Sequence, residues 1–345
     1  MEKVLAIFSL LIAVAVAQNF KSCGENEICV DIRKCPKYKS YIGLSFANLP
    51  SELKSMAKAN VCSTEKTAEG QVINVCCPTV LNPKQCGVQA GDRISKGTVA
   101  KPFEYPWMVL LKDSSGAFVC GGTLISKRYV LTAAHCLRGY FNITSVRLGE
   151  NDIRKEIDCN VVDGEEDCAD PPQDIEVEKT ERHPGHSERM KKNDIALIRL
   201  KRSAQLSDSV RVICLPNGTP AQKAVQPEFW VVSGWGLTED GAAFDVLRYA
   251  RVPPVSQDKC AQRVRSLNNY LTLDPSQICA GGIDAVDNCS GDSGGPLQYV
   301  STVAARYIQY GVVSYGVRDC GVQSEPGVYT NVNHYLNWIV ENVDE

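Results

Sequence analysis

Three short motifs carry residues that could together cleave an amide bond. Ser293 lies in a glycine-rich turn, Gly291-Asp-Ser-Gly-Gly295, near the C-terminal end of the chain. His135 lies far upstream beside Cys136, and Asp194 lies between the two, immediately before an apolar run. A serine hydroxyl becomes a strong nucleophile when a nearby base takes its proton and a third group orients that base. The order His, Asp, Ser therefore predicts a nucleophilic serine hydrolase.

Each of these residues has an expected role. We expect Ser293 to be the nucleophile, His135 to be the base that later protonates the leaving amine, and Asp194 to stabilise the charged histidine. The backbone N–H groups of Gly291 and Ser293 would bind the oxyanion. Taken singly, a histidine beside a cysteine and an aspartate before a strand also fit ordinary core and turn positions. The Gly-Asp-Ser-Gly-Gly-Pro turn is more specific, and the three motifs together favour catalysis.

The N-terminal residues 1–17 predict a secretory signal peptide. Val4 to Ala17 are almost wholly apolar and end in a small-x-small cleavage pattern. A membrane anchor is the alternative, but the run is shorter than the roughly 20 residues that a span needs. The 16 cysteines then indicate an oxidising compartment and disulfides. The 4 histidines are scattered and disfavour a zinc site, and a net charge of −3 gives no reason to expect nucleic acid.

Cysteine spacing divides the mature chain. The N-terminal cysteines end in an adjacent pair: Cys23, Cys29, Cys35, Cys62, Cys76 and Cys77. This stretch is too short to build much core, so disulfides must hold it. Residues 51–60 predict a short helix with Ser51 as its N-cap. Residues 78–93 are rich in turn formers and indicate a linker that carries Cys86.

From residue 94 onward, short strand-like runs recur between turn residues. They cover 107–112, 119–125, 129–133, 195–200, 230–234, 306–314 and 327–330. Many short strands with turns between them predict an antiparallel barrel or sandwich. The only convincing helix is 333–342, where Leu336, Ile339 and Val340 form an apolar face around Trp338. Asn142 and Asn217 begin glycosylation sequons.

The motifs around His135, Asp194 and Ser293 resemble those of the chymotrypsin-like serine proteases across residues 94–345. The resemblance implies an all-β fold, with two six-stranded antiparallel barrels, a C-terminal helix and the three residues in the cleft between the barrels. The N-terminal cysteines resemble the clip domain of arthropod clip-domain serine proteases. The expected division is a signal peptide (1–17), a clip domain (18–77), a linker with an activation site (78–93) and a trypsin-like domain (94–345).

The resemblance also implies the substrate pocket. In relatives that cut after Arg or Lys, an aspartate lies at the pocket floor, and Asp287 occupies that position. A carboxylate in a poorly hydrated slot binds a cationic side chain far better than an apolar one. Gly316 and Gly327 occupy the wall positions and leave the entry open, and Ser314 to Gly316 should pair with the substrate backbone as an edge strand. Asp287 could otherwise be an ordinary loop residue.

Two positions near this pocket leave alternatives open. Tyr315 stands where relatives most often have tryptophan, so the subsites beyond the first are not predicted. Lys191, three residues before Asp194, either overhangs the next subsite and disfavours basic groups there, or is a solvated surface lysine.

An activation switch is implied by the junction of Arg93 with Ile94. Cleavage after Arg93 would free the Ile94 amine, and its ammonium would pair with the Asp292 carboxylate and order the pocket. Ser95 and Lys96 depart from the usual Ile-Val-Gly-Gly start. An arginine before the cut implies an activating protease of the same specificity. The alternative is that Arg93 is only a basic linker residue.

The family further implies a disulfide pattern and a calcium site. The implied pairs are Cys23–Cys76, Cys29–Cys62, Cys35–Cys77, Cys120–Cys136, Cys260–Cys279, Cys289–Cys320 and the interchain tether Cys86–Cys214. Cys159 and Cys168 flank an acidic loop, so we expect them to pair with each other. Residues 150–174 are crowded with carboxylates, and relatives bind calcium here through oxygen ligands. Glu150 is the best single candidate, although a solvated acidic loop fits equally well. No cofactor is expected for catalysis.

These features predict a secreted zymogen endopeptidase that cuts after Arg or Lys in an extracellular cascade of innate immunity in haemolymph. By resemblance, its substrates are prophenoloxidase or its helpers in melanisation, or a Spätzle-like precursor in Toll signalling. An upstream protease would activate it and a serpin would inhibit it, and neither nucleic acid nor a membrane is expected as a partner. One alternative is a binding cofactor without catalysis, against which the complete set of His135, Asp194 and Ser293 argues. A digestive trypsin is the other, against which the N-terminal module argues.

Overall fold

The computed structural model describes residues 20–41, 51–68, 70–89, 99–162, 164–219, 222, 225–236, 245–268, 270–282, 292–301, 305–316 and 326–344. Several of the predicted features lie outside these residues. They are the signal peptide, the Arg93–Ile94 junction, Asp287, Gly291 and the cysteine pair Cys289 and Cys320.

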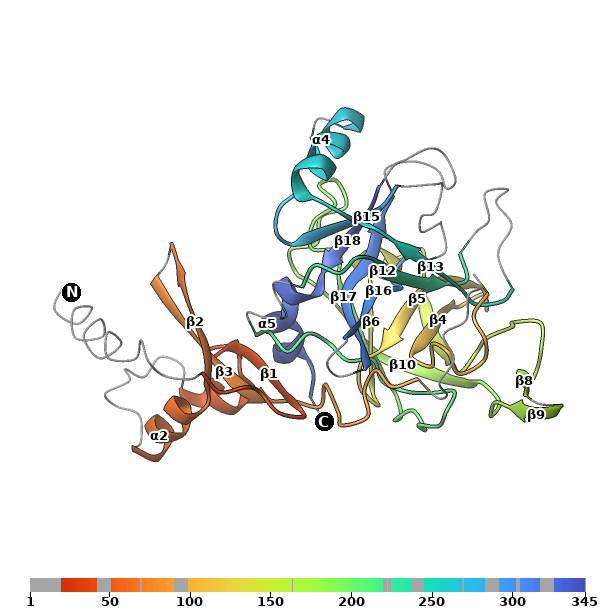
Figure 1. The fold of residues 1–345 in the computed structure, drawn as a ribbon, viewed down its shortest axis with the longest axis horizontal. Helices are drawn as coiled ribbons and strands as arrows, with labels where there is room; N and C mark the ends of the chain where they lie inside the picture. Colours follow the sequence, from red (N-terminus) through yellow and green to blue (C-terminus); the bar gives the residue numbers. More distant parts are fainter. Residues whose placement is uncertain are drawn as a thin grey trace.

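The first barrel is a closed ring of antiparallel strands (Figure 1). Its strands are β4 (Met108–Asp113), β5 (Phe118–Leu124), β6 (Tyr129–Thr132), β7 (Ile143–Leu148), β10 (Gln173–Arg182) and β11 (Ala196–Leu200). They close in the order β10-β11-β6-β5-β4-β7. Val109, Leu111 and Val146 are fully buried inside the ring. Because the ring closes, no strand has an unpaired edge that could pair with another chain.

The second barrel is a curled antiparallel sheet. It contains β12 (Trp230–Gly234), β13 (Arg248–Val252), β14 (Pro254–Val255), β15 (Gln277–Gly281), β16 (Pro296–Ser301), β17 (Arg306–Tyr315) and β18 (Pro326–Asn331). The order is β13-β12-β16-β17-β18-β15-β14. The end strands β13 and β14 are pieces of one segment, interrupted at Pro253, which has no N–H to donate. That segment pairs with β12 on one side and β15 on the other, so the sheet closes as six strands. The predicted pair of barrels is confirmed.

The N-terminal module is a three-stranded sheet with two helical segments. It has β1 (Glu27–Asp31), β2 (Val61–Thr67) and β3 (Gly70–Pro78) in the order β1-β3-β2, with the 3-10 helix η2 (Pro36–Tyr41) and α2 (Ser51–Ala59). Ile28, Val30 and Val75 are buried in its small core. Three disulfides join the strands and loops, as expected where little apolar area is available.

This module rests on the C-terminal helix α5 (Val332–Asn342), which lies between the module and the second barrel (Figure 1). The Asp31 backbone N–H donates to Asn337 Oδ1 at 2.9 Å, and Lys34 Nζ lies 3.1 Å from Glu341 Oε2. The linker is attached as well, because the Tyr307 N–H donates to the Gly87 carbonyl at 2.8 Å. Side-chain and backbone contacts therefore join the two parts.

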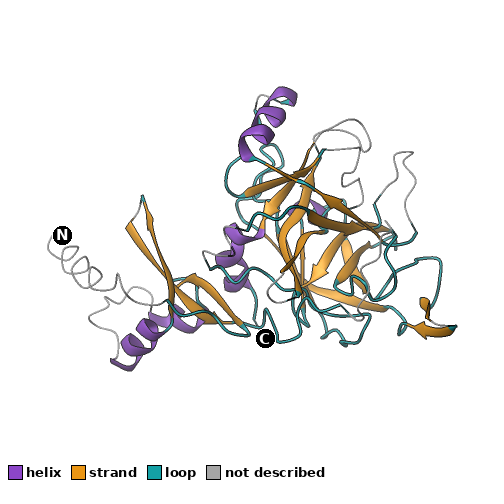
Figure 2. Cartoon of the chain, viewed as in Figure 1, coloured by secondary structure: helices purple, strands orange, loops and turns teal. Residues whose placement is uncertain are grey.

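The helices show one error in the sequence prediction. Figure 2 shows a molecule built mainly of strands. The predicted helix 333–342 is observed as α5, but it is not the only helix in this part, because α4 spans Gln257–Leu267. The Ser256 side chain caps α4 by accepting the Lys259 N–H. Only Cys260 and Val264 of α4 are deeply buried, so its apolar periodicity is weak.

A small hairpin projects from the first barrel, formed by β8 (Cys159–Val162) and β9 (Glu165–Cys168) (Figure 1). Disulfides form as the resemblance implies wherever both cysteines are described. The pairs are Cys23–Cys76, Cys29–Cys62, Cys35–Cys77, Cys86–Cys214, Cys120–Cys136, Cys159–Cys168 and Cys260–Cys279. Within the described ranges, none of the helices combines the length and apolar character that a membrane crossing requires.

Candidate active site

His135 and Asp194 meet at the seam between the barrels. His135 lies in the short 3-10 helix η4 (Ala134–Leu137), which follows β6, and Asp194 lies just before β11. Because β6 and β11 are paired, with Thr132 opposite Ala196, the two residues are brought to the same end of the ring. His135 Nδ1 lies 2.8 Å from Asp194 Oδ2, and the His135 backbone N–H donates to Asp194 Oδ1 at 2.9 Å. This two-point contact fixes the imidazole orientation.

The second barrel supplies further hydrogen bonds to the same aspartate. Ser314 Oγ donates to Asp194 Oδ2 at 2.5 Å, and Thr330 Oγ1 donates to the Asp194 carbonyl at 2.7 Å. Asp194 is 4% exposed, and burial alone would raise the pKa of its carboxyl. The hydrogen bonds from His135 and Ser314 and the His135 charge outweigh burial, so the net pKa lies below its ordinary value. The Asp194 carboxylate is therefore ionised at neutral pH, and its negative charge can stabilise His135 when the imidazole is protonated.

Ser293 lies where the two barrels touch. Its carbonyl accepts the Gly121 N–H of β5 at 2.8 Å, while the next residue, Gly294, donates to the Val313 carbonyl of β17 at 2.9 Å. Gly294 has a φ of 83°, and an added Cβ would collide with Thr132 Oγ1 and the Gly121 carbonyl. Glycine is therefore required here, because the turn packs directly against the end of β6, which leads into η4 and His135.

The Asp292 carboxylate occupies a space that only glycines leave open. A Cβ added at Gly234 or at Gly236 would overlap the Asp292 side chain. The Gly236 N–H donates to Asp292 Oδ1 at 2.9 Å. The half-buried residue before Ser293 is thus held against the end of β12. A change in what Asp292 binds would be transmitted directly to the Ser293 turn.

The predicted pocket residues are only partly described. Ser314 is buried near the end of β17, with Gly316 exposed just beyond it, and Gly327 is buried in β18 opposite Ala280. Strands β17 and β18 pair with each other, so both glycines lie on neighbouring strands. The predicted floor residue Asp287 and the oxyanion residue Gly291 lie outside the described residues.

Sequence reasoning missed several contacts around Asp194. Ser314 was expected only to bind substrate backbone, yet its hydroxyl bonds the aspartate. The Tyr335 hydroxyl of α5 donates to Asn193 Oδ1 at 2.8 Å, and His186 Nε2 lies 3.6 Å from Asp194 Oδ1. Burial lowers the pKa of His186, so it is neutral at neutral pH despite its acidic neighbour. No local motif marks these contacts, because they depend on how α5 and β17 dock.

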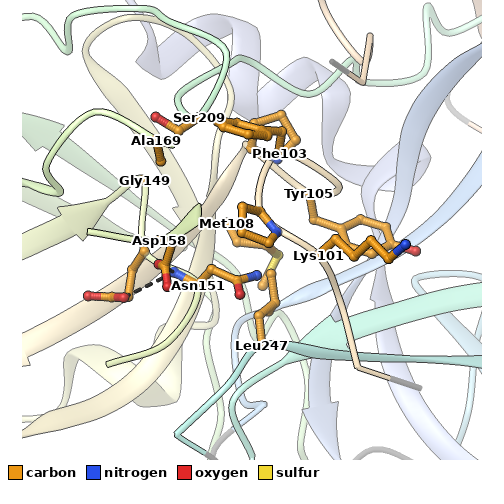
Figure 3. A pocket seen from close by; sticks show the side chains of 13 residues that line it. Lys101, Phe103, Tyr105, Met108, Gly149, Asn151, Asp158, Ala169, Ser209 and Leu247 are labelled. Carbon is orange, nitrogen blue, oxygen red and sulfur yellow. Dashed lines mark hydrogen bonds between the residues drawn. The ribbon is translucent and has the colours of Figure 1, made fainter. Parts of the chain in front are cut away.

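A second group of ionisable residues lies away from Ser293, in a pocket beside the first barrel (Figure 3). Asp158 Oδ2 accepts the Asn151 N–H at 3.0 Å, and Glu150 Oε2 accepts from Arg147 at 3.3 Å. The Glu150 side chain is 1% exposed, and Asp158 is buried too. Burial raises the pKa of both carboxyls, and the Asp158 charge adds to the effect on Glu150. The basic residues that act on these two acids are Arg147, beside Glu150, and Lys155, near Asp158.

Comparisons with known proteins show the family of this chain. A sequence model of the Trypsin family matches residues 94–339. The chain belongs to the trypsin family. It is 35% identical to the CLIP domain-containing serine protease HP8 of Bombyx mori, covering 100% of this chain and 99% of the relative. It is 37% identical to Phenoloxidase-activating factor 3 of Holotrichia diomphalia, covering 98% of each chain.

A solved structure is similar to this chain over nearly its whole length. The Drosophila Grass clip serine protease of the Toll pathway superimposes with a TM-score of 0.68 at 33% identity, covering 94% of this chain and 97% of that one. Because these relatives match nearly from end to end, the chain is a clip-domain, trypsin-like serine protease. The N-terminal sheet β1–β3 corresponds to the clip part of the sequence prediction.

Proposed function

We propose that this protease is a secreted zymogen that cleaves protein substrates after Arg or Lys in an extracellular immune cascade. Ser293 attacks the scissile carbonyl, His135 takes its proton and passes it to the leaving amine, and Asp194 stabilises the imidazolium. Backbone N–H groups at Gly291 and Ser293 bind the oxyanion. The observation that carries the proposal is the His135–Asp194–Ser314 hydrogen-bonded group beside the Ser293 turn.

The relatives support the cascade role. One is named for activating phenoloxidase, and the Grass structure is assigned to the Toll pathway. The substrates of this protease are therefore zymogens or cytokine precursors of melanisation or Toll signalling. An upstream protease activates it and a serpin inhibits it. Secretion rests on the sequence of residues 1–17, and the exposed Asn142 and half-buried Asn217 are its glycosylation sites.

Specificity for Arg and Lys is tested by replacing the pocket aspartate. We expect the activated enzyme to cleave a peptide library only after basic residues. Asp287→Ser should reduce kcat/KM for these substrates by on the order of a thousandfold, because the substrate cation would lose the carboxylate proposed to pair with it. Ser314→Ala is the control: it should lower activity about tenfold but leave the preference for basic residues unchanged, because the pocket charge stays. A preference for aromatic or small residues in the wild type would contradict the assignment.

Activation requires cleavage after Arg93, and the clip domain stays attached afterwards. Cys86 lies before the cut and forms a disulfide with Cys214, which lies after it. The other six disulfides that are described join residues on the same side of the cut. The freed Ile94 ammonium binds Asp292, which is packed against Gly234 and Gly236, and so orders the Ser293 turn.

The expected cleavage products follow from this disulfide. Treating the zymogen with a trypsin-like activator should give two chains that run together without reductant and separate with it. Sequencing of the heavy chain should start at Ile94. Arg93→Gln should stay inactive and uncut. Chains that separate without reductant would rule out the tether, and activity in the uncut protein would rule out the switch.

The acidic pocket is a calcium site in this proposal. Glu150 and Asp158 supply buried, hard oxygen donors; burial raises the pKa of both carboxyls, and the Asp158 charge raises that of Glu150 further. Asp152 does not contribute its side chain, because it is paired with Arg154 at 2.9 Å. A calcium ion would neutralise the two acids and brace the loop between β7 and β8. Catalysis itself needs no metal.

Calcium removal should lower the melting temperature. At a concentration one hundred times the dissociation constant, binding stabilises the folded state by about 2.7 kcal/mol, or on the order of 5 °C in Tm. Glu150→Gln should abolish this shift, whereas Glu176→Gln, an exposed acid on β10, should leave it intact. An equal Tm with calcium and with chelator in the wild type would refute the site.

A further inference from the structure

Tyr140 is an exposed aromatic residue whose ring is held by its neighbours. It is 68% exposed, among the most exposed of the large apolar residues that the structure describes. Arg138 Nη1 donates to the Tyr140 hydroxyl, and the guanidinium lies 5.7 Å from the ring centroid. Arg138 is itself fixed, because its Nε lies 2.6 Å from Glu188 Oε1. The Phe141 ring meets Tyr140 edge-on, with the centroids 4.9 Å apart. These contacts restrict the ring while it stays in solvent.

The Tyr140 ring lies on the same side of the chain as a glycosylation sequon. Tyr140, Asn142 and Thr144 are all exposed. Between them, Phe141 packs against the core and Ile143 is buried. Side chains that alternate in this way place residues two apart on one side of the chain. The aromatic ring and the acceptor amide of Asn142 therefore face solvent on the same side.

Of the two sequons that the structure describes, only the one at Asn142 has such a neighbour. Leu215 stands two residues before Asn217, and it is 1% exposed. The Asn217 Oδ1 also accepts the Thr219 N–H at 3.1 Å and the Thr219 hydroxyl at 2.7 Å. An exposed ring beside the acceptor asparagine is thus a particular feature of the Asn142 sequon.

A sugar ring matches an exposed aromatic face. The first sugar of an N-linked glycan is N-acetylglucosamine, and one face of its pyranose ring consists mainly of C–H bonds. Those hydrogens carry a partial positive charge, whereas the face of an aromatic ring is negative. Stacking also removes apolar area of both partners from water. We propose that Tyr140 binds the first N-acetylglucosamine of a glycan on Asn142.

This inference rests on the proposed function, which includes secretion and glycosylation of Asn142. When the glycan forms, the Asn142 amide nitrogen loses a proton and bonds to C1 of the sugar. The lipid diphosphate that carried the oligosaccharide is the leaving group. The finished glycan begins directly beside the Tyr140 ring, so the contact needs no further partner.

The stacked sugar fixes the segment that follows the catalytic histidine. His135 lies in η4, and the chain from Arg138 to Asn142 leads from η4 to β7. The ion pair of Arg138 with Glu188 joins this segment to the loop that follows β10. A sugar that holds Tyr140 therefore restrains a connection between two parts of the first barrel. Stability of the folded protein should depend on the glycan and on Tyr140 together.

A double-mutant cycle tests the contact. The proteins are the full-length zymogen, secreted from cells that add oligomannose glycans, with Tyr140→Ala, Asn142→Gln or both. Each single change should lower Tm by on the order of 3 °C, and the double variant should lose no more than the larger single loss. Tyr140→Phe keeps the aromatic face and should keep the coupling to the glycan. Tyr270→Ala is the matched control, because Tyr270 is 73% exposed and precedes no sequon.

Trimming the glycan with endoglycosidase H, which leaves only the first sugar, should not change the Tm of the wild type. Mass spectrometry of the glycopeptide gives the occupancy of Asn142, and the fully occupied fractions are compared. Additive losses in the double variant would overturn the proposal, as would a loss on trimming equal to that of Asn142→Gln. An unoccupied Asn142 in the wild type would instead contradict the proposed glycosylation, and this inference with it.

Discussion

Ser293→Ala should lower the turnover of the activated enzyme by on the order of a millionfold, because the whole catalytic group acts as a unit and fails without its nucleophile. The Ser293 carbonyl and the neighbouring Gly294 make the backbone contacts that position the turn, so the fold should persist. Hydrolysis of an arginine peptide amide, with Tm as the check on folding, measures the effect. The matched control is Ser301→Ala at the end of β16. Comparable activity in the Ser293→Ala enzyme would disprove the assignment.

Asp194→Asn should cost on the order of ten-thousandfold in kcat. Asp194 accepts hydrogen bonds on both oxygens, from the His135 N–H, His135 Nδ1 and Ser314. An asparagine NH₂ would face either the His135 backbone N–H, a second donor, or His135 Nδ1, where it favours the wrong tautomer. In both orientations the side chain lacks the charge that stabilises the imidazolium. Ser314→Ala removes one hydrogen bond only and should cost about tenfold. Equal losses in the two variants would contradict this division of roles.

The same substitution should change the pH dependence of stability. Because the folded pKa of Asp194 lies below its ordinary value, the carboxylate contributes stability that is fully present above the unfolded pKa of about 3.9. That contribution is lost as the pH falls through the folded pKa. The free energy of unfolding should therefore fall more steeply in acid for the wild type than for Asp194→Asn. Denaturant titrations from pH 5 down to pH 2 would show parallel curves if Asp194 were not involved.

The site residues that lie in local motifs could be predicted from the sequence. The residues whose contacts depend on how distant elements pack together could not. His135 and Asp194 were expected to pair, and the pairing of β6 with β11 brings them together. The disulfides followed from the family pattern. The Ser314 and Tyr335 contacts could not be predicted, because they depend on how β17 and α5 pack against the first barrel. Helix α4 was missed because only Cys260 and Val264 mark its buried face.

The closure of the second barrel could not be predicted from local motifs either. Pro253 interrupts one segment so that its two halves pair with opposite ends of the sheet. A Pro-containing run of this kind indicates a weak edge strand when it is read alone. Of the two buried acids, Glu150 was named as a candidate but Asp158 was not, because composition does not show which carboxylates lose contact with water.

Covalent labelling of the activated enzyme with a fluorophosphonate tests the central claim most directly. Such a reagent phosphonylates a serine only when a base activates its hydroxyl and an oxyanion site receives the new charge. After cleavage at Arg93, mass spectrometry should find one adduct, on Ser293. The adduct should be absent from the uncut Arg93→Gln protein and strongly reduced in Asp194→Asn. A folded, correctly cleaved enzyme with no adduct on Ser293, or with its adduct on another residue, would contradict the account.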